Sequence, residues 1–123
     1  MRVISKSRLR QFWIRPRCSD SEGPLKAWYA HVSRRSVAWR GWADVKAMFA
    51  TASIVGNCIV FNVGGNKYRL ATRVLYPSRK VFILKVMTHD EYDQNSWKEE
   101  CGCFQGPPPQ RPAKPKGSKR RNT

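Results

Sequence analysis

A polar cluster follows directly on an apolar stretch of this sequence. Val86-Met87 is succeeded by Thr88-His89-Asp90-Glu91-Tyr92-Asp93. Functional residues often lie at strand ends and in adjoining loops, where a rigid scaffold positions them. His89 is one of two histidines, and histidine exchanges protons near neutral pH. The cluster therefore indicates an acid–base site.

A second group of reactive side chains lies in residues 67–76, which alternate in polarity. One set of alternating positions is mostly apolar, and the other carries Lys67, Arg69 and Arg73. Cations two residues apart on one strand face form a stripe that a nucleic-acid backbone can follow. A solvated strand face would look the same. The polar cluster that follows favours the functional interpretation.

These residue types match what RNA cleavage without a metal requires. A base takes the proton of the 2′-OH, cations stabilise charge on the phosphate, and an acid protonates the departing 5′-oxygen. His89, Arg69 or Lys67, and Tyr92 are candidates for these roles, and the sequence leaves open which residue plays which. His31 lies within a predicted helix, and we expect it to be structural or on the surface.

Competing signatures are missing from the sequence. Gly64-Gly65-Asn66 lacks the Lys-Ser/Thr of a phosphate-binding loop, and there is no G-x-S-x-G motif. Asp90, Glu91 and Asp93 are the main acidic residues that could hold Mg²⁺, and we interpret them as the start of a helix. We therefore expect neither a metal nor another cofactor.

Charge favours a polyanionic partner. The chain has 24 Lys and Arg against 8 Asp and Glu, for a net charge of +16. Residues 107–123 hold six of the basic residues and no acidic one, so the rest carries +10. Such an excess is most useful for neutralising phosphates. An anionic membrane is the alternative, but the sequence shows neither a continuous basic helix face nor an apolar stretch of about 18 residues. We expect a cytoplasmic protein with no membrane partner.

The four cysteines give a weak signal. Cys101-Gly102-Cys103 is a single C-x-C, and neither paired C-x2-C motifs nor paired histidines accompany it. For Cys18, Cys58, Cys101 and Cys103 we expect free thiols in a reducing cytosol.

The elements that must position the candidate site are helices followed by strands. Residues 1–5 favour a short edge strand, and Ser5 or Ser7 can cap a helix that ends near Phe12 or Trp13. A second helix starts near Pro24, with Leu25, Trp28, Tyr29 and Val32 on its buried face, and a third covers about residues 42–50. The aromatic residues Trp28, Tyr29, Trp39 and Trp42 suit core packing better than base stacking.

Period-two segments follow these helices. Strands are predicted over residues 58–63, 67–76 and 81–88, with turns at residues 64–66 and 77–80. The prediction is an α+β fold in which N-terminal helices pack on a small twisted antiparallel β-sheet. We expect one domain over residues 1–104 and a disordered, proline-rich basic tail over residues 105–123.

Two motifs, in order and at matching spacing, resemble the HigB-type toxins of type II toxin–antitoxin systems. They are Phe61-Asn62-Val63-Gly64-Gly65-Asn66-Lys67-Tyr68-Arg69-Leu70 and Val86-Met87-Thr88-His89-Asp90-Glu91-Tyr92-Asp93. Further similarity lies in residues 1–5, 25–29 and 42–46, so that the resemblance covers roughly residues 1–97.

The resemblance implies a RelE-like fold and a metal-independent endoribonuclease that cuts ribosome-bound mRNA and inhibits translation. It implies a helix-turn-helix antitoxin as partner, with operator DNA reached only through that antitoxin. The family's motif positions correspond to Asn66, Lys67, Arg69, His89 and Tyr92. We expect His89, Arg69, Tyr92 and Lys67 to be catalytic, and Asn66, Arg73 and Lys85 to contact RNA.

The chain departs from the family pattern at Leu84, where a basic residue is common. Lys85 follows one position later, and it can replace that charge only if the strand register shifts. Two other functions remain open: a non-catalytic RNA- or ribosome-binding module, and a degenerate toxin that acts as a co-repressor. The first would bind RNA without producing new ends, and only the Leu84 substitution favours the second.

Overall fold

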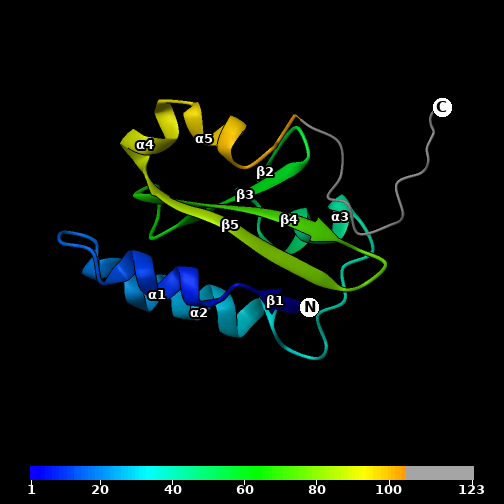
Figure 1. Cartoon of the computed structure of the whole chain (residues 1–123). Coiled ribbons are helices and arrows are strands. Elements are labelled where there is room, and N and C mark those ends of the chain that lie inside the picture. Colours follow the sequence, from blue (N-terminus) through cyan, green and yellow to red (C-terminus); the bar gives the residue numbers. More distant parts are fainter. Residues whose placement is uncertain (105–123) are drawn as a thin grey trace.

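The computed structural model describes residues 1–104, which form one sheet with helices on both of its faces (Figure 1). Its helical elements are α1 (Ser7–Trp13), η1 (Ser19–Ser21), α2 (Glu22–Val32), α3 (Trp42–Met48), α4 (His89–Asp93) and α5 (Ser96–Glu100). Its strands are β1 (Arg2–Ile4), β2 (Ser53–Val55), β3 (Cys58–Val63), β4 (Tyr68–Leu75) and β5 (Lys80–Thr88). The α+β class is confirmed, and the prediction for residues 105–123 lies outside the described residues.

The five strands are ordered β1-β5-β4-β3-β2. β2 to β5 form an antiparallel meander, whereas β1 pairs in parallel with the start of β5, with Val3 opposite Val81. The prediction of an entirely antiparallel sheet is therefore wrong at this edge. The reason is that the helices after β1 separate it from the meander, so its direction is not set by a hairpin.

The hairpin between β3 and β4 is built as its residues predict. Gly64 and Gly65 have φ values of +63° and +69°, in the left-handed region that glycine adopts without a Cβ penalty. The turn sets β3 against β4 in the register that places Asn62 opposite Arg69. Arg69 and Arg73 lie on the same sheet face, because side chains alternate along β4 and the two residues are four positions apart.

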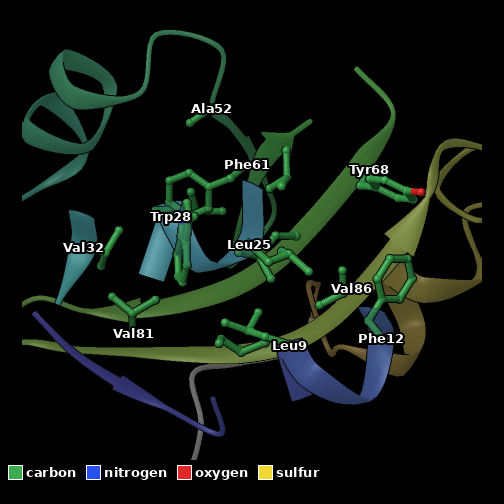
Figure 2. Close-up of a cluster of buried hydrophobic side chains, with 14 of the residues drawn as sticks. Leu9, Phe12, Leu25, Trp28, Val32, Ala52, Phe61, Tyr68, Val81 and Val86 are labelled. Atoms are coloured by element: carbon green, nitrogen blue, oxygen red, sulfur yellow. The ribbon is translucent and has the colours of Figure 1, made fainter. Parts of the chain in front are cut away.

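The larger core lies between the sheet and the N-terminal helices (Figure 2). The apolar positions of α2 point into it at helical spacing, and Leu25 and Val32 have no exposed surface. Trp28 and Trp39 pack on Phe61 with ring centroids 5.4 and 6.1 Å apart. Core packing of these two tryptophans is thus confirmed, and Tyr29 and Trp42 are partly buried against the same cluster.

A second, smaller core lies on the opposite face of the sheet, beneath α4 and α5. It consists of buried residues from β3, β4, β5 and the C-terminal layer: Cys58, Val60, Ala71, Met87, Trp97 and Cys103. The sequence predicted that this face would carry cations and did not predict an apolar core on it. Helix α5, which the sequence did not predict either, buries it instead.

A disulfide joins Cys58 to Cys103 within this smaller core. The expectation of four free thiols is therefore wrong for these two cysteines, whereas Cys18 and Cys101 are free. The two partners are 45 residues apart, and only the return of the chain over the sheet brings them together. Within residues 1–104, every helix is too short or too polar to span a lipid bilayer.

Candidate active site where β4 begins and β5 ends

The two sequence motifs meet at one end of the sheet. Because β4 and β5 are antiparallel, Tyr68 at the start of β4 lies opposite Thr88 at the end of β5. The backbone N–H of His89 donates to the Lys67 carbonyl at 3.2 Å. The structure thus brings together two segments separated by about twenty residues of sequence.

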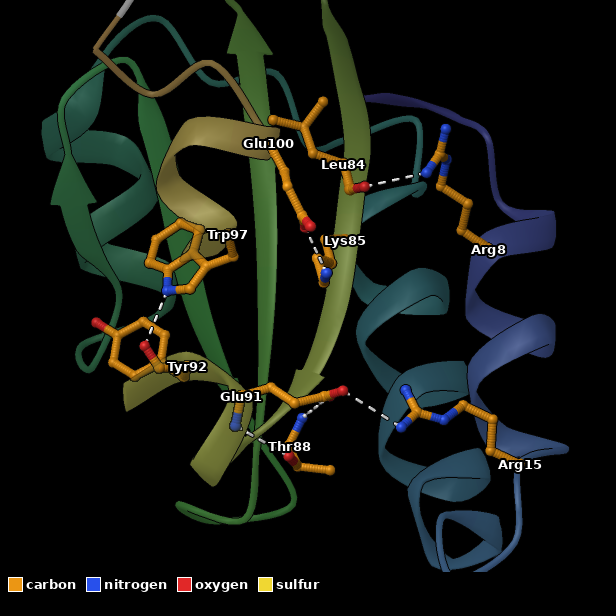
Figure 3. A network of polar contacts seen from close by, with 9 residues as sticks. All are labelled: Arg8, Arg15, Leu84, Lys85, Thr88, Glu91, Tyr92, Trp97 and Glu100. Carbon is orange, nitrogen blue, oxygen red and sulfur yellow. Dashed lines mark hydrogen bonds and ion pairs between the residues drawn. The ribbon is translucent and has the colours of Figure 1, made fainter. Parts of the chain in front are cut away.

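Helix α4 begins with a capping box at this point. The Thr88 hydroxyl accepts the Glu91 backbone N–H at 3.2 Å, and the Glu91 carboxylate accepts the Thr88 N–H at 2.9 Å (Figure 3). Arg15, just after α1, lies 3.4 Å from the same carboxylate. Burial raises the pKa of Glu91, but the hydrogen bond from the Thr88 backbone and the nearby Arg15 outweigh it, so that the pKa is lowered. Glu91 therefore fixes where α4 starts and is not free for catalysis.

His89 is presented at the first position of α4. Its Nδ1 lies 3.1 Å from an Asp93 carboxylate oxygen one helical turn later, and its side chain is half exposed. When Nδ1 carries the proton and donates to Asp93, Nε2 is the basic nitrogen and is available to a substrate. A carboxylate behind an imidazole orients the ring, and sequence reasoning gave Asp93 no such role.

Arg69 and Tyr92 form the second part of the site. The Arg69 side chain donates to the Asn66 carbonyl at 2.8 Å, and its guanidinium carbon lies 5.1 Å from the centre of the Tyr92 ring. Tyr92 in turn stacks on Trp97, with ring centroids 5.3 Å apart and planes 20° from parallel. The Trp97 indole N–H donates to the Tyr92 carbonyl at 2.9 Å. Arg69 is only 9% exposed, so its charge acts from the floor of the site.

Lys67 points toward the helical side of the hairpin. It forms an ion pair with Asp20 of η1, and Asp20 also accepts the Tyr68 hydroxyl at 2.5 Å. Hydrogen bonds from Lys67 and Tyr68 lower the pKa of Asp20. Burial and the Asp20 carboxylate raise the pKa of Tyr68 to about 12. Sequence reasoning had interpreted residues 19–24 only as a turn, and no local signal reveals the contact of Asp20 with residues 47 and 48 positions later.

Lys85 shares the sheet face of Arg69, because Met87 lies opposite Arg69 and Lys85 is two residues from Met87 on the same strand. Ala71 lies opposite Lys85 and Thr72 lies opposite Ile83, which leaves Leu84 as the extra residue of a bulge. A register shift is therefore present next to Leu84, but it lies beyond Lys85 and does not set the face on which Lys85 lies. Lys85 forms an ion pair with Glu100 at 2.5 Å.

Arg8, Arg15 and Lys85 line a groove of about 370 Å³ between α1 and β5. Arg8 donates to the Leu84 carbonyl at 3.1 Å and closes part of the groove wall (Figure 3). The groove extends the cationic surface of the site toward the middle of β5.

Arg73 lies apart from the other predicted residues. It is 8% exposed and donates to the Gly102 carbonyl at 2.9 Å, beneath the segment that follows α5. Arg73 could therefore act on a ligand at the site only through its electrostatic field. Asn66, by contrast, is exposed in the hairpin and accepts the Asn62 side-chain amide at 3.2 Å.

The remaining histidine lies elsewhere. His31 is exposed on α2, as expected of a surface residue, and its ring centroid lies 6.0 Å from that of Phe49 in an edge-on arrangement. Across residues 1–104, no three or more His, Cys, Asp or Glu side chains gather in a way that could hold a metal ion. Asp90, Glu91 and Asp93 thus lie on α4 without forming such a group.

Comparison with known proteins identifies similar proteins. The model of a family described as HigB_toxin, a RelE-like toxic component of a toxin–antitoxin system, matches residues 21–95. The mRNA interferase toxin HigB of Escherichia coli K12 is 56% identical over 34 residues, which are 28% of this chain and 33% of that protein. The mRNA interferase HigB of Shigella flexneri matches to the same extent. The chain thus spans about a third of the length of the curated relatives it matches.

Proposed function

The chain belongs to the HigB toxin family of RelE-like toxic components, and on that premise we propose that it is an endoribonuclease that cuts mRNA on the ribosome and so inhibits translation. The proposal rests on one observation: His89, Arg69 and Tyr92 lie at the same end of the sheet, where β4 begins and β5 ends. An acid–base residue, a cation and a phenol at this place are the groups that a phosphodiester cleavage needs.

The reaction proceeds by attack of the RNA's own 2′-oxygen. His89 Nε2 takes the 2′-OH proton while Asp93 holds the ring through Nδ1. The 2′-oxygen forms a bond to phosphorus as the bond to the 5′-oxygen breaks, and the Tyr92 hydroxyl donates its proton to that leaving oxygen. The products are a 2′,3′-cyclic phosphate and a 5′-hydroxyl end. Because the proton transfers are assigned to side chains, the proposed reaction needs no metal.

Cations stabilise the charge that grows on the phosphate during this step. Arg69 is preorganised for this task, since the Asn66 carbonyl and the Tyr92 ring fix its guanidinium. Lys67 reaches the phosphate by leaving its exposed ion pair with Asp20, which costs little in high dielectric. Asn66, Lys85 and, through its field, Arg73 bind the RNA backbone beside the reacting bond.

Three partners complete the proposal. They are the mRNA with its ribosome, a helix-turn-helix antitoxin that neutralises the toxin, and operator DNA that the toxin reaches only through the antitoxin. The family membership supports the antitoxin, because it defines the toxin as one component of a pair.

The test maps 5′ ends on a defined message incubated with the purified full chain. Two arms differ in the presence of translating ribosomes, and EDTA is added to the free-RNA arm. His89→Ala is expected to abolish the new ends, whereas His31→Ala, a change of the other histidine outside the site, is expected to leave them unchanged.

Each outcome is informative. New ends only with ribosomes support the proposal as stated, and EDTA-resistant ends in free RNA would retain the nuclease but remove the ribosome requirement. RNA binding without new ends in either arm would show that the chain is a non-catalytic binding module and would overturn the proposed endoribonuclease activity.

A further inference from the structure

We propose that the disulfide between Cys58 and Cys103 is a reversible redox lock that holds the C-terminal layer of α4 and α5, and with it Tyr92, in place over Arg69. The effect on RNA cleavage rests on the function proposed above. The effect on the layer itself does not, and the two can be measured separately.

The disulfide attaches the C-terminal end of the layer to the sheet. The layer starts at Thr88, where the capping box joins it to β5, and Cys103 follows its second helix. Cys58 is the first residue of β3, so the disulfide fixes that second end to the sheet. Helices α4 and α5 have five residues each. Helices so short are unstable alone, so their order depends on what attaches them.

Other contacts at the same end also require a close approach of the two segments. The Asn57 N–H donates to the Cys103 carbonyl at 2.5 Å, and Arg73 donates to the Gly102 carbonyl at 2.9 Å. A Cβ on Gly56 would lie 2.0 Å from the Cys103 carbonyl oxygen, so only glycine fits there. These bonds form only while Cys103 lies against the start of β3. Loss of the disulfide therefore weakens them together.

Trp97 connects the lock to the candidate active site. It is 1% exposed and belongs to the same small core as the two cystine residues. Its ring stacks on Tyr92, and its indole N–H holds the Tyr92 backbone. A layer that loosens at Cys103 thus releases the ring on which Tyr92 rests. Misplacement of a catalytic group by about 1 Å can cost roughly a hundredfold in rate.

The exchange chemistry is that of a dithiol reductant. One reductant thiolate attacks a cystine sulfur and releases the other cysteine, which leaves a mixed disulfide. The second reductant thiolate attacks the reductant sulfur of this mixed disulfide and releases the remaining protein cysteine. Two electrons and two protons pass to Cys58 and Cys103, and the reductant becomes a disulfide. Cys58 and Cys103 are both 0% exposed, so the layer must open locally before attack. Burial raises the pKa of Cys101, which makes this neighbouring thiol a poor internal nucleophile.

The first measurement identifies the disulfide and its effect on the local stability of residues 89–103. Full-length protein is alkylated under denaturing conditions without reductant and digested. A peptide pair joining Cys58 to Cys103 is expected, with Cys18 and Cys101 alkylated. Hydrogen exchange is then compared before and after incubation with dithiothreitol. We expect amides of residues 89–103 to exchange at least about tenfold faster after reduction, and those in the centre of β3 to β5 to be unchanged.

Matched variants separate the lock from a general effect of reductant. Cys58→Ala/Cys103→Ala keeps the small core apolar and is expected to show fast exchange in residues 89–103 with or without dithiothreitol. Its melting temperature is expected to fall by roughly 10 °C relative to the oxidised protein. Cys18→Ala changes a buried free cysteine of the other core and is expected to respond to dithiothreitol as the wild type does.

The second measurement follows cleavage at a temperature where the reduced protein remains folded by circular dichroism. Reduction is expected to slow wild-type cleavage at least about tenfold, reoxidation to restore it, and the double variant to be insensitive to both. Four alkylated cysteines, or equal exchange in both redox states, would overturn the lock. If exchange responds but no form cuts RNA, the lock stands and the proposed nuclease falls. If hydrogen exchange in residues 89–103 responds to reduction but the cleavage rate does not, the proposal that the disulfide controls the position of Tyr92 is wrong.

Discussion

Tyr92 has two separable attributes, a ring and a hydroxyl. The ring lies between the Arg69 guanidinium and the Trp97 indole. The hydroxyl is the group proposed to protonate the leaving 5′-oxygen. A substitution that removes one attribute and keeps the other therefore distinguishes positioning from proton transfer.

Tyr92→Phe is expected to lower the single-turnover cleavage rate by about 10²- to 10⁴-fold, the usual contribution of a positioned general acid. The free energy of unfolding is expected to change by less than about 0.5 kcal/mol, because both ring contacts persist. Quenched-flow cleavage and urea denaturation provide the two values. A nearly normal rate would assign the proton to another donor.

At the level of elements, α4 depends on a carboxylate. Glu91 joins the cap of α4 to Arg15 after α1, and its pKa is lowered in the folded protein. A group with a lowered folded pKa stabilises the fold fully above its unfolded value, here 4.5. That stabilisation is lost as the pH falls through the folded pKa.

We therefore expect Glu91→Gln to be less stable than the wild type at pH 7, by about 1 kcal/mol. Below pH 4.5 the difference is expected to narrow, since the wild type loses a contribution that the variant never had. Urea denaturation at a series of pH values between 7 and 3 measures it. A constant difference would mean that the Glu91 charge is not what stabilises the cap.

The elements that follow strong local patterns could be predicted from sequence. α1 is confirmed over Ser7–Trp13, and β3 to β5 lie within two residues of the predicted bounds. The predicted cap by Ser5 or Ser7 is wrong, because Lys6 is the N-cap residue and no side chain caps the helix. β2 was not predicted, because three residues give no measurable alternation. α5 was not predicted either, since it follows Asn95 in a left-handed conformation without a side-chain cap. The third helix ends at Met48, two residues before the predicted end.

The candidate site could be predicted only in part, for a related reason. Its members on β4, β5 and α4 lie within two continuous motifs, and strand pairing brings these motifs together. The contacts of Asp20 with Lys67 and of Arg15 with Glu91 join residues whose proximity depends on helix packing. The burial of Arg73 and the pairing of Cys58 depend on the segment that follows α5. Because α5 was not predicted, neither feature could be predicted from the sequence.

At the scale of the whole molecule, charge governs affinity for RNA. The net charge is +16, and few basic side chains of the described residues have acidic partners. Each phosphate contact releases counterions, so binding weakens with salt at a slope of about −0.7 per contact for single-stranded RNA. With about four contacts, affinity is expected to fall roughly 50-fold between 50 and 200 mM salt.

Filter binding of the His89→Ala protein, which is expected not to cut its ligand, measures this slope. Lys67→Gln should reduce the slope by about 0.7, the value of one contact. Lys80→Gln, at the opposite end of β5 from Thr88, serves as the matched control and should leave the slope unchanged. Equal effects of the two variants would mean that RNA does not bind at the proposed site.

The parallel pairing of β1 with β5 has a consequence for the order in which the molecule is made. Ile4 of β1 lies opposite Phe82 of β5. The ribosome must therefore add roughly 80 further residues after β1 before β1 can pair with β5. At translation rates of about 5–20 residues per second, that delay is roughly 4–16 s. Leu9, Leu25 and Trp28 pack against a sheet completed by the same late strand, so they remain uncovered during this interval. His89 and Tyr92 emerge later still, and a nascent chain on its own ribosome therefore carries no assembled site.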